Sequence, residues 1–335
     1  MKNTYFIGVD GGGTKTITVI SDEEGSIASL IKTGPSNFQT FGIQKAYKEL
    51  KLGIELALKK AHIKKAEIAY GGFGISGADR DKDFDIIMSI LSDILPDTPK
   101  ILVNDTTIAL RAATSDGIGL ALISGTGTNC IGFNKKGEMV RIGGLGPLTG
   151  DYGSGSDIAM AAYHAAFKYN DKRGKYTVLY DMIKRHFNTH DIEELIELTY
   201  FDSYDYHKLN TITPLVFKAA QMGDSIANKI LINCANALSH SAITALKRLF
   251  KKEEKITIAL GGSVFIKQPK SLMVEIIRKK IIHLYPKVKF TVLDTEPVIG
   301  ALLLAYDKFY GDGRANRLKR NIKVGIKKAL KGYPK

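Results

Sequence analysis

The sequence predicts an α/β protein built from two similar lobes. Its 335 residues suit two domains, because one domain usually holds roughly 100–200 residues. Strand-like and helix-like segments alternate over the first hundred residues, which is typical of a covered, partly parallel sheet. A strand, a glycine- and threonine-rich turn and a second strand occur near the N-terminus and again after residue 120. This repetition indicates duplication of a βββαβα unit.

The first lobe is expected to open with an antiparallel meander, because three short apolar runs are separated only by turn residues. A helix follows, since apolar residues recur three or four positions apart over 43–61. The remaining elements alternate between strand and helix. The predicted strands are 5–9, 16–21, 27–31, 68–75 and 101–103, with a further helix at 84–95.

The second lobe repeats the opening hairpin and then departs from it. A helical insertion is expected at about 157–250, before a buried strand resumes at 256–260. No low-complexity linker separates the lobes, so the boundary near residue 115 is expected to be a hinge. The predicted division is 1–115 for the first lobe, 116–294 for the second, 295–312 for a helix returning toward the first, and 313–335 for a basic tail.

Composition excludes several classes of protein. Hydrophobic residues make up 44% and charged residues 24%, which does not fit a disordered, collagenous or coiled-coil chain. No apolar run approaches the roughly 20 residues that cross a bilayer, and the start leads directly into a strand, so we expect a cytoplasmic protein. Cys130 and Cys234 lack the spacing of a metal or redox site, and both are expected to be reduced and buried.

The net charge of +14 is concentrated at the C-terminus. Residues 313–335 hold nine Lys or Arg and no acid, so the rest of the chain carries +5. Apolar residues four apart, at Leu318, Ile322, Ile326 and Leu330, predict a loosely amphipathic helix. Such a helix could lie on an anionic membrane or a nucleic acid; the favoured interpretation is a solvated helix laid against a lobe or partly frayed.

Two glycine-rich turns are candidate phosphate sites. In VDGGGTKT and SGTGTN the turns expose backbone N–H groups beside hydroxyls, which suits phosphate oxygens. One such turn could be an ordinary hairpin, but its repetition favours a nucleotide triphosphate held from both sides of a cleft. Neither turn has the P-loop or Rossmann pattern.

Three aspartates accompany these turns. Asp10, next to the first, suits Mg²⁺, directly or through water. Asp105 follows a strand in VNDT and is either a functional carboxylate or a helix N-cap. Asp151 lies in GGLGPLTGDYGSGSD and has the same alternative, since a helix begins near Ser156. The ALGGSVF segment ends a strand in paired glycines, whose flat backbone suits the face of an adenine ring.

Taken together and in order, IGVDGGGTKT, GPSN, VNDT, ISGTGTNC, GGLGPLTGDYGSGS, ALGGSVF and EPVIGALLLA resemble the N-acetylglucosamine kinases and the wider BadF/BadG/BcrA/BcrD ATPase group. The resemblance covers about residues 5–311 and implies the actin, Hsp70 and sugar-kinase superfold, a two-lobed ribonuclease H-like ATPase. It also implies roles for individual residues. Asp105 is implied as catalytic base; Gly12, Gly13, Thr14, Lys15, Gly125, Thr126, Gly127, Ala220, Gly261 and Gly262 as ATP-binding; and Asn37, Asp105, Gly144, Leu145, Gly146 and Asp151 as sugar-binding.

The implied activity is ATP-dependent phosphorylation of a sugar hydroxyl, O6, with Mg²⁺ near Asp10. The sugar is left open among N-acetylglucosamine, glucosamine, glucose, N-acetylmannosamine and N-acetylmuramic acid. Leu145 stands where the family commonly has an aromatic residue, and Tyr152 where it has an acid. An aromatic ring can stack on a sugar face and leucine cannot, so the family's sugar does not carry over to this chain from these two positions. A homodimer is expected, with neither nucleic acid nor membrane as partner.

Two alternatives are a nucleotide-dependent regulator and an activator ATPase. Sugar-sensing regulators of this superfold carry an N-terminal helix-turn-helix, for which the strand beginning at Tyr5 leaves no room. The activator ATPases hold an iron–sulfur cluster on closely placed cysteines. Cys130 and Cys234 lie too far apart in the sequence for that arrangement.

Overall fold

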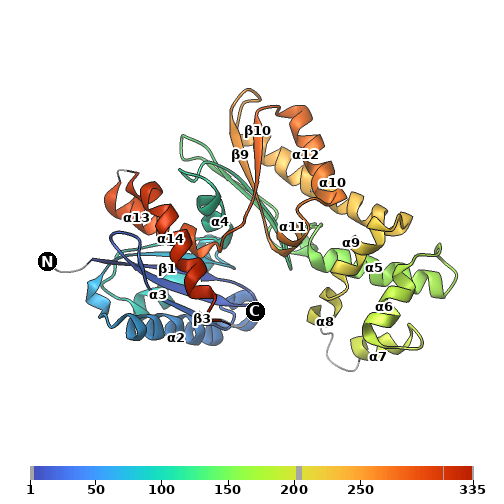
Figure 1. Ribbon diagram of the computed structural model, residues 1–335, viewed down its shortest axis with the longest axis horizontal. Coiled ribbons are helices and arrows are strands. Elements are labelled where there is room, and N and C mark those ends of the chain that lie inside the picture. The colour runs from blue at the N-terminus through green and yellow to red at the C-terminus, as the bar shows by residue number, and fades with distance from the viewer. Residues whose placement is uncertain (1–3, 201–205, 312, 334–335) are drawn as a thin grey trace. The chain divides into compact units, whose positions relative to one another are not determined.

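The computed structural model describes residues 4–200, 206–311 and 313–333, and its chain forms two compact units. Unit 1 consists of Met1–Gly119 together with Leu293–Lys335, and unit 2 of Leu120–Val292. Each unit contains one five-stranded sheet with helices packed on it (Figure 1). The two units are described separately below.

The sheet of unit 1 has the strand order β3-β2-β1-β4-β5. Its first three strands form an antiparallel meander, and β4 and β5 continue parallel to β1. All five predicted strands and the predicted helix at 43–61 are present, whereas the helix predicted at 84–95 begins three residues earlier and ends one residue earlier, and the short helix at 38–41 was not predicted. The strands are β1 (Tyr5–Gly11), β2 (Thr16–Asp22), β3 (Ile27–Thr33), β4 (Ile68–Ile75) and β5 (Lys100–Val103); the helices are α1 (Phe38–Phe41), α2 (Ile43–Ala61), α3 (Asp81–Ile94), α4 (Asp105–Ala113), α13 (Val298–Tyr310) and α14 (Arg314–Leu330).

Successive side chains along the strands of this sheet point to its two opposite faces. Ile7 and Val9 pack with α2 and α3 in one apolar core. On the other face, Gly8 and Gly72 of neighbouring strands leave room for α13, because a Cβ at either position would overlap with that helix. Gly300 of α13 lies equally close to the backbone of α4. These close approaches fix α4, and with it the polar residues at its first turn.

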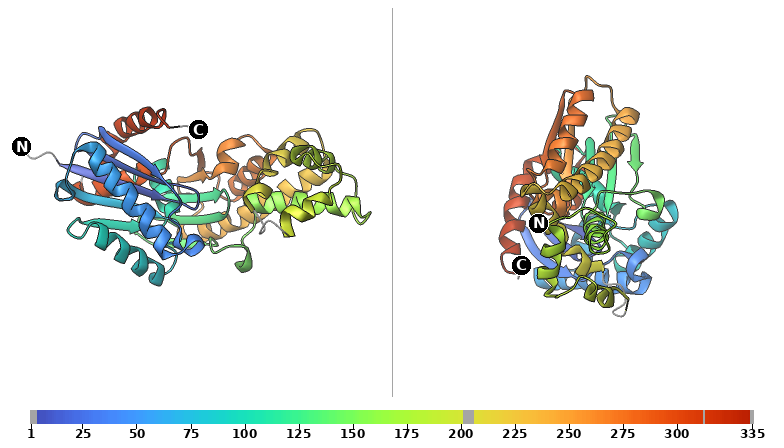
Figure 2. Two further views of the ribbon diagram at one scale, coloured as in Figure 1. Left: turned by 90° about the horizontal axis from the view of Figure 1, so that it is seen from below. Right: turned by 90° about the vertical axis from the view of Figure 1, so that its right-hand side faces the viewer.

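The C-terminal helix α14 is part of unit 1. It runs along the outside of the unit, next to β3 and α13 (Figures 1 and 2). Its apolar side chains Ala315, Ile322 and Ile326 are buried. The buried Arg111 of α4 binds Asp307 of α13 at 2.7 Å and Asn316 of α14 at 3.2 Å. The helix predicted for the tail is therefore present and held against the unit by several contacts; Lys335 lies outside the described residues.

Unit 2 has the strand order β10-β9-β6-β7-β8, in which β6, β9 and β10 are parallel. The helical insertion expected at about 157–250 is present between β8 and β9, and its long helix α10 packs on β7 and β8. The strands are β6 (Gly119–Ser124), β7 (Thr128–Phe133), β8 (Met139–Ile142), β9 (Ile256–Gly261) and β10 (Val288–Val292); the helices are α5 (Gly155–Asn170), α6 (Leu179–Phe187), α7 (Glu194–Tyr200), α8 (Tyr206–Asn210), α9 (Thr213–Gln221), α10 (Ser225–Leu249), α11 (Ser263–Lys267) and α12 (Leu272–Leu284).

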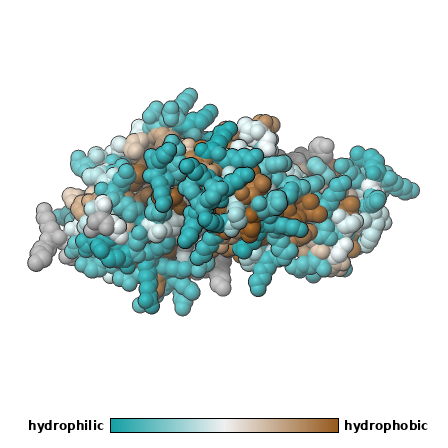
Figure 3. All heavy atoms as spheres, turned by 90° about the horizontal axis from the view of Figure 1, so that it is seen from above, coloured by the Kyte–Doolittle hydropathy of each residue, from teal (hydrophilic) through white to brown (hydrophobic). Residues whose placement is uncertain are grey.

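One face of the molecule is mainly polar (Figure 3). Hydrophilic side chains cover most of the face seen in Figure 3, with apolar residues showing between them. Among the residues that the structure describes, no helix is both long and apolar enough to cross a membrane. Cys130 and Cys234 are buried free thiols, as predicted, and burial raises the pKa of both.

Candidate active site

The first glycine-rich turn joins β1 to β2 in unit 1. The Gly12 N–H donates to the carbonyl of Lys15 at 2.9 Å, which closes the turn, and the Gly12 carbonyl accepts from Ser36 N–H at 3.1 Å. Gly13, Thr14 and Lys15 at its tip are exposed. No atom lies within 4 Å of the place where a Cβ would stand on Gly13. The tip can therefore receive a phosphate group without displacing a side chain.

Asp10 is the last residue but one of β1, the strand that leads into this turn, and it lies among other charged groups of unit 1. Removal from water, together with the negative charges of Asp105 and Glu296, raises the pKa of Asp10 to about 7, and the nearby Lys15 opposes the shift. Lys15 Nζ donates to Glu296 Oε2 at 3.0 Å. Glu296 precedes α13, and the sequence alone did not mark it. Around Asp10 the negative side chains outnumber the positive ones, so a bound cation would be stabilised there.

The Asp10 carboxylate, next to the first glycine-rich turn, fits a Mg²⁺ site. The cation commonly binds one or two carboxylates, keeps several waters and takes its remaining ligands from substrate phosphates. Among the described residues no group of three or more His, Cys, Asp or Glu side chains is arranged to hold a metal. A single carboxylate beside a phosphate turn matches the Mg²⁺ pattern better than a closed protein cage would.

Asp105 is the first residue of α4, and the helix cap is its neighbour. Asn104 is the N-cap, and its side-chain oxygen accepts from Thr106 N–H at 2.9 Å. The capping alternative for Asp105 is therefore wrong. Burial and the negative charge of Asp79 raise the pKa of Asp105 to about 6, while hydrogen bonds from Thr106 and Ser76 oppose this shift. A carboxyl with such a pKa is mostly ionised at neutral pH and can accept a proton.

Polar residues from two other segments join Asp105. Asn37 caps α1, accepting from Gln39 N–H at 2.9 Å, and its amide donates to Ser76 Oγ at 3.2 Å. Asn104 donates to Asp79 at 3.0 Å. Unit 1 thus brings the predicted Asn37 and Asp105 into one polar group through Ser76 and Asp79, which the sequence reasoning missed. Their segment, SGADR, directly follows the strand β4, so the strand-end position that marked Asp105 could also have marked them.

The second glycine-rich turn joins β6 to β7 in unit 2. Gly125 N–H donates to the Gly127 carbonyl at 2.9 Å, and the Gly125 carbonyl accepts from Gly155 N–H, at the start of α5, at 2.7 Å. Gly127, like Gly13, has nothing within 4 Å of a Cβ position. Gly262 follows β9 with φ +88°, and a Cβ there would overlap with the Ser124 carbonyl. The paired glycines and the second turn are therefore in contact.

A pocket of about 160 Å³ opens beside this turn within unit 2. Apolar groups from α9 and α11 meet polar side chains here, which is a usual composition for a base or ribose site. Ala220, predicted to bind adenosine, lies on α9 but is absent from the lining, and Phe217 and Pro214 of the same helix stand there instead. The lining residues are Gly125, Thr126, Gly155, Asn210, Thr213, Pro214, Phe217, Ser263, Val264, Lys267 and Gln268.

Asp151 holds the glycine-rich loop that precedes it. One of its carboxylate oxygens, Oδ2, accepts from Leu145 N–H at 2.8 Å and from Gly146 N–H at 2.7 Å. Gly144 and Gly146 have φ of +82° and +98°, a backbone region that favours glycine. Helix α5 is capped by Ser154, so the helix-capping alternative for Asp151 is wrong. Asp151 instead fixes the loop that carries three other predicted sugar-binding residues.

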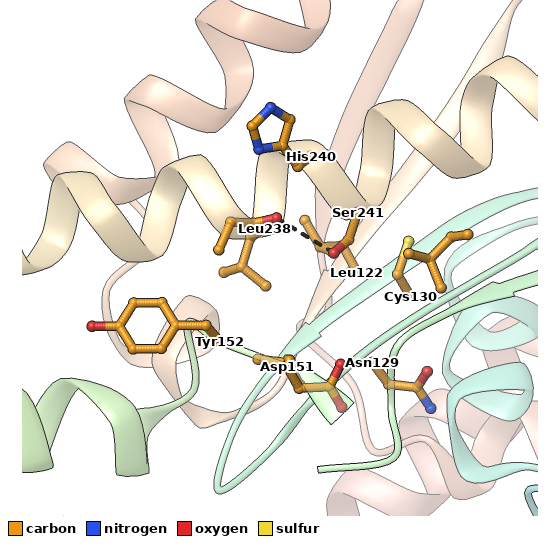
Figure 4. Close-up of a pocket in the computed structure, with 12 residues that line it drawn as sticks. Leu122, Asn129, Cys130, Asp151, Tyr152, Leu238, His240 and Ser241 are labelled. Atoms are coloured by element: carbon orange, nitrogen blue, oxygen red, sulfur yellow. Dashed lines mark hydrogen bonds between the residues drawn. The ribbon is translucent and has the colours of Figure 1, made fainter. Parts of the chain in front are cut away.

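The same aspartate lines a cavity of about 270 Å³ in unit 2 (Figure 4). Asp151 and Asn129 lie on one side of it, and His240 and Ser241 come from α10 on the other. The Tyr152 ring turns aside, and its hydroxyl interacts with the buried Cys234. Leu145, at the other position where the sequence departs from the family pattern, is 50% exposed.

The predicted residues therefore fall into two sets, one in each unit. The first phosphate turn, Asp10, Asn37 and Asp105 belong to unit 1. The second phosphate turn, the paired glycines and the Asp151 loop belong to unit 2. Apart from Ala220, each set lies in or beside a turn, loop or cavity that can contact a small ligand.

Comparison with known proteins supplies the remaining evidence. The sequence profile of the BadF/BadG/BcrA/BcrD ATPase family matches residues 7–305. An N-acetyl-D-glucosamine kinase of Dictyostelium discoideum is 33% identical, over 91% of this chain and 98% of the relative. An N-acetylmuramic acid/N-acetylglucosamine kinase of Clostridium acetobutylicum is 32% identical, over 90% and 98%. A ROK family glucokinase from Streptomyces griseus, solved with glucose and AMPPNP, shares the fold with a TM-score of 0.57 at 18% identity, covering 91% of this chain and 99% of its own.

Proposed function

The chain belongs to the BadF/BadG/BcrA/BcrD ATPase family, and from this premise we propose that it is an ATP-dependent sugar kinase. The proposed substrate is an amino sugar or hexose such as N-acetylglucosamine or glucosamine, and the proposed acceptor is its O6 hydroxyl. Two relatives that match nearly the whole chain are named as kinases of N-acetylated amino sugars. The observation that carries the proposal is Asp105, a carboxyl with a raised pKa at the start of α4, beside Ser76 and close to Asp79.

In this proposal Asp105 accepts the proton of the attacking sugar hydroxyl. Asn37 and Ser76 orient the sugar from unit 1, and the loop fixed by Asp151 binds it from unit 2. Phosphoryl transfer depends mainly on positioning and on neutralising charge, so orientation of the hydroxyl contributes much of the rate. A base with a pKa near 6 remains ionised at neutral pH and is still basic enough to assist.

The ATP is proposed to bind through both glycine-rich turns. Gly125, Thr126 and Gly127 contact phosphate oxygens, and the pocket beside them takes the adenosine. Gly12, Gly13, Thr14 and Lys15 form the second set of phosphate contacts. Asp10 would hold Mg²⁺, directly or through water, and the cation would neutralise phosphate charge.

A sugar screen tests this function. ADP release is measured with ATP and Mg²⁺ in the presence of each candidate sugar, and the phosphorylated carbon is identified by NMR of the product. We expect one or more amino sugars to stimulate ADP release far above the rate without sugar, with phosphate on O6. ATP hydrolysis that no sugar changes would contradict the kinase assignment and favour a nucleotide-dependent regulator.

The pH dependence of turnover follows from Asp105. A bound cation favours the ionised form of Asp10, whose pKa is otherwise raised to about 7. At saturating Mg²⁺, ATP and sugar the profile is therefore set by Asp105, whose pKa is raised to about 6, and turnover should be level near pH 7–8 and fall about tenfold per pH unit well below pH 6. A raised folded-state pKa contributes stability that is present below the unfolded value and lost as pH rises through about 6. This group therefore cannot cause acid unfolding at pH 5, and melting curves at each pH check that point. Level turnover down to pH 5 would contradict the role of Asp105.

Substitutions of Asp151 distinguish two roles of its carboxylate, which are binding the sugar directly and fixing the loop at Leu145 and Gly146. Charge-assisted hydrogen bonds to the sugar are worth roughly 1.5–3 kcal/mol, so Asp151→Ala should weaken sugar binding about 10- to 150-fold and leave ATP affinity nearly unchanged. Asp151→Asn keeps one oxygen that can accept from both Leu145 and Gly146 N–H groups. If Asp151 only fixes the loop, the asparagine variant should bind sugar almost normally. Isothermal titration with each ligand measures both affinities, and equal loss for ATP would indicate a structural role.

A further inference from the structure

Helix α14 lies beyond residues 7–305, the part of the chain that matches the family. The segment 313–335 contains no Asp or Glu. One face of the helix packs on unit 1 through Ala315, Ile322 and Ile326. At the end of the helix, Tyr333 donates its hydroxyl hydrogen bond to the Leu30 carbonyl at 2.8 Å. The helix is thus fixed along its length, and its orientation determines which side chains face outward.

The outward face carries a row of cations. Exposed residues recur three or four positions apart at 317, 320, 324, 327 and 331, the spacing of one helix face. All of these are Lys or Arg except Val324, and the exposed Lys328 lies beside them. At a rise of about 1.5 Å per residue the row is about 21 Å long. We call it the basic stripe; it consists of Arg317, Arg320, Lys327, Lys328 and Lys331.

Further cations stand beside the C-terminal half of the stripe. The ammonium groups of Lys32 and Lys60 lie 5.1 and 5.9 Å from the centre of the Tyr333 ring. Acidic side chains occur toward the other half, where Asp294 pairs with Lys323 at 2.8 Å. Positive charge is therefore densest around residues 327–333.

We propose that the basic stripe docks this protein on an anionic lipid bilayer. A flat helix face presents all its cations to a plane at once, and clusters of four to eight Lys or Arg are typical of binding to anionic lipids. Val324, in the middle of the stripe, is 62% exposed. An apolar side chain among cations gains from contact with a lipid surface and gains nothing from phosphates alone. Proteins that bind single-stranded nucleic acid usually stack aromatic rings on bases, and none of the exposed residues of α14 is aromatic.

The proposed contact differs from that of an amphipathic helix that inserts its apolar face into lipid. The apolar face of α14 is already covered by unit 1, so only the charged face is available. Docking of this kind is electrostatic, is weakened by salt and leaves the helix unchanged. It does not depend on the kinase assignment.

Vesicle sedimentation tests the proposal. The full chain is mixed with vesicles of phosphatidylcholine containing 30% phosphatidylglycerol, and with vesicles of phosphatidylcholine alone. We expect binding to the anionic vesicles only, and its loss as salt is raised. Each cation near an anionic surface is worth about a fivefold change in partition. The variant R320Q/K327Q/K328Q/K331Q should therefore bind several hundredfold more weakly.

A matched variant separates the stripe from net charge. K251Q/K252Q/K280Q/K287Q removes four exposed lysines of unit 2 and changes the net charge equally, so it should keep nearly all vesicle binding. Both variants should retain the melting temperature and the ATP turnover of the unaltered chain, since neither touches the candidate active site. Equal loss of binding in the two variants would overturn the proposal.

Val324→Asn distinguishes a bilayer from another polyanion. Valine and asparagine have similar helix propensities, so the helix should persist. The variant should bind anionic vesicles several-fold more weakly and bind a single-stranded RNA probe no differently. If the chain binds the RNA but not the vesicles, or if V324N leaves vesicle binding unchanged, the assignment to lipid is wrong.

Discussion

Replacing Asp105 by asparagine should abolish most turnover and leave the fold intact. General-base catalysis is typically worth about 10²–10⁴-fold, or roughly 3–5 kcal/mol of barrier, and asparagine cannot take the proton. The helix does not depend on this carboxyl for capping, because Asn104 is the N-cap of α4. We therefore expect Asp105→Asn to bind ATP and sugar, to melt near the normal temperature and to lose at least about a hundredfold in sugar-dependent ADP release.

Asp81→Asn is the matched control for this experiment. Asp81 is also the first residue of a helix, α3, but it is exposed. The control removes the same charge at the same helix position, so it reports the effect on the helix alone. A stable Asp105→Asn protein with more than about a tenth of normal turnover would falsify the assignment of Asp105 as the base.

Removing α14 should destabilise unit 1 strongly. The helix buries Ile322 and Ile326 almost completely, and burying one such side chain stabilises a fold by about 1.5–3 kcal/mol. Truncation after Gly311 also removes Asn316, a partner of the buried Arg111. A loss of about 3–6 kcal/mol is a large part of a typical stability of 5–15 kcal/mol. At 2–4 °C per kcal/mol, the melting temperature should fall by about 6–24 °C.

Single substitutions keep this prediction testable if the truncated chain does not fold. Ile322→Ala should cost about 2–5 kcal/mol. Val324→Ala, two residues along the same helix but 62% exposed, should change the free energy of unfolding by less than about 0.5 kcal/mol. Thermal or urea unfolding of the two variants measures the difference. Equal stability of both would mean that α14 contributes little to unit 1.

The strands and the long helices could be predicted because their apolar residues follow the period of the element. The helix at 43–61 and the strand at 68–75 were predicted with the bounds that the structure has. The two candidate phosphate turns could be located because glycines cluster where backbone N–H groups must be accessible to a ligand. These signals are local, and they need no knowledge of what packs against them.

Features that depend on how loops fold and on which face of a helix meets a pocket could not be predicted from periodicity. The role of Asp151 in holding Leu145 and Gly146 depends on how a loop folds back on itself, which spacing does not reveal. The pairing of Lys15 with Glu296 joins residues far apart in the sequence. Ala220 was placed in the adenosine site, whereas Phe217, one turn earlier on α9, faces the pocket.

The composition of unit 1 from both ends of the chain has a consequence for biosynthesis. Unit 2, Leu120–Val292, is one continuous segment and can fold as soon as it leaves the ribosome. Unit 1 lacks α13 until Val298–Tyr310 has been translated. Until then the sheet surface at Gly8 and Gly72, on which that helix packs, remains uncovered. The lobe that is made first is therefore completed last, and a nascent chain stalled before Leu293 would expose an unfinished sheet to chaperones.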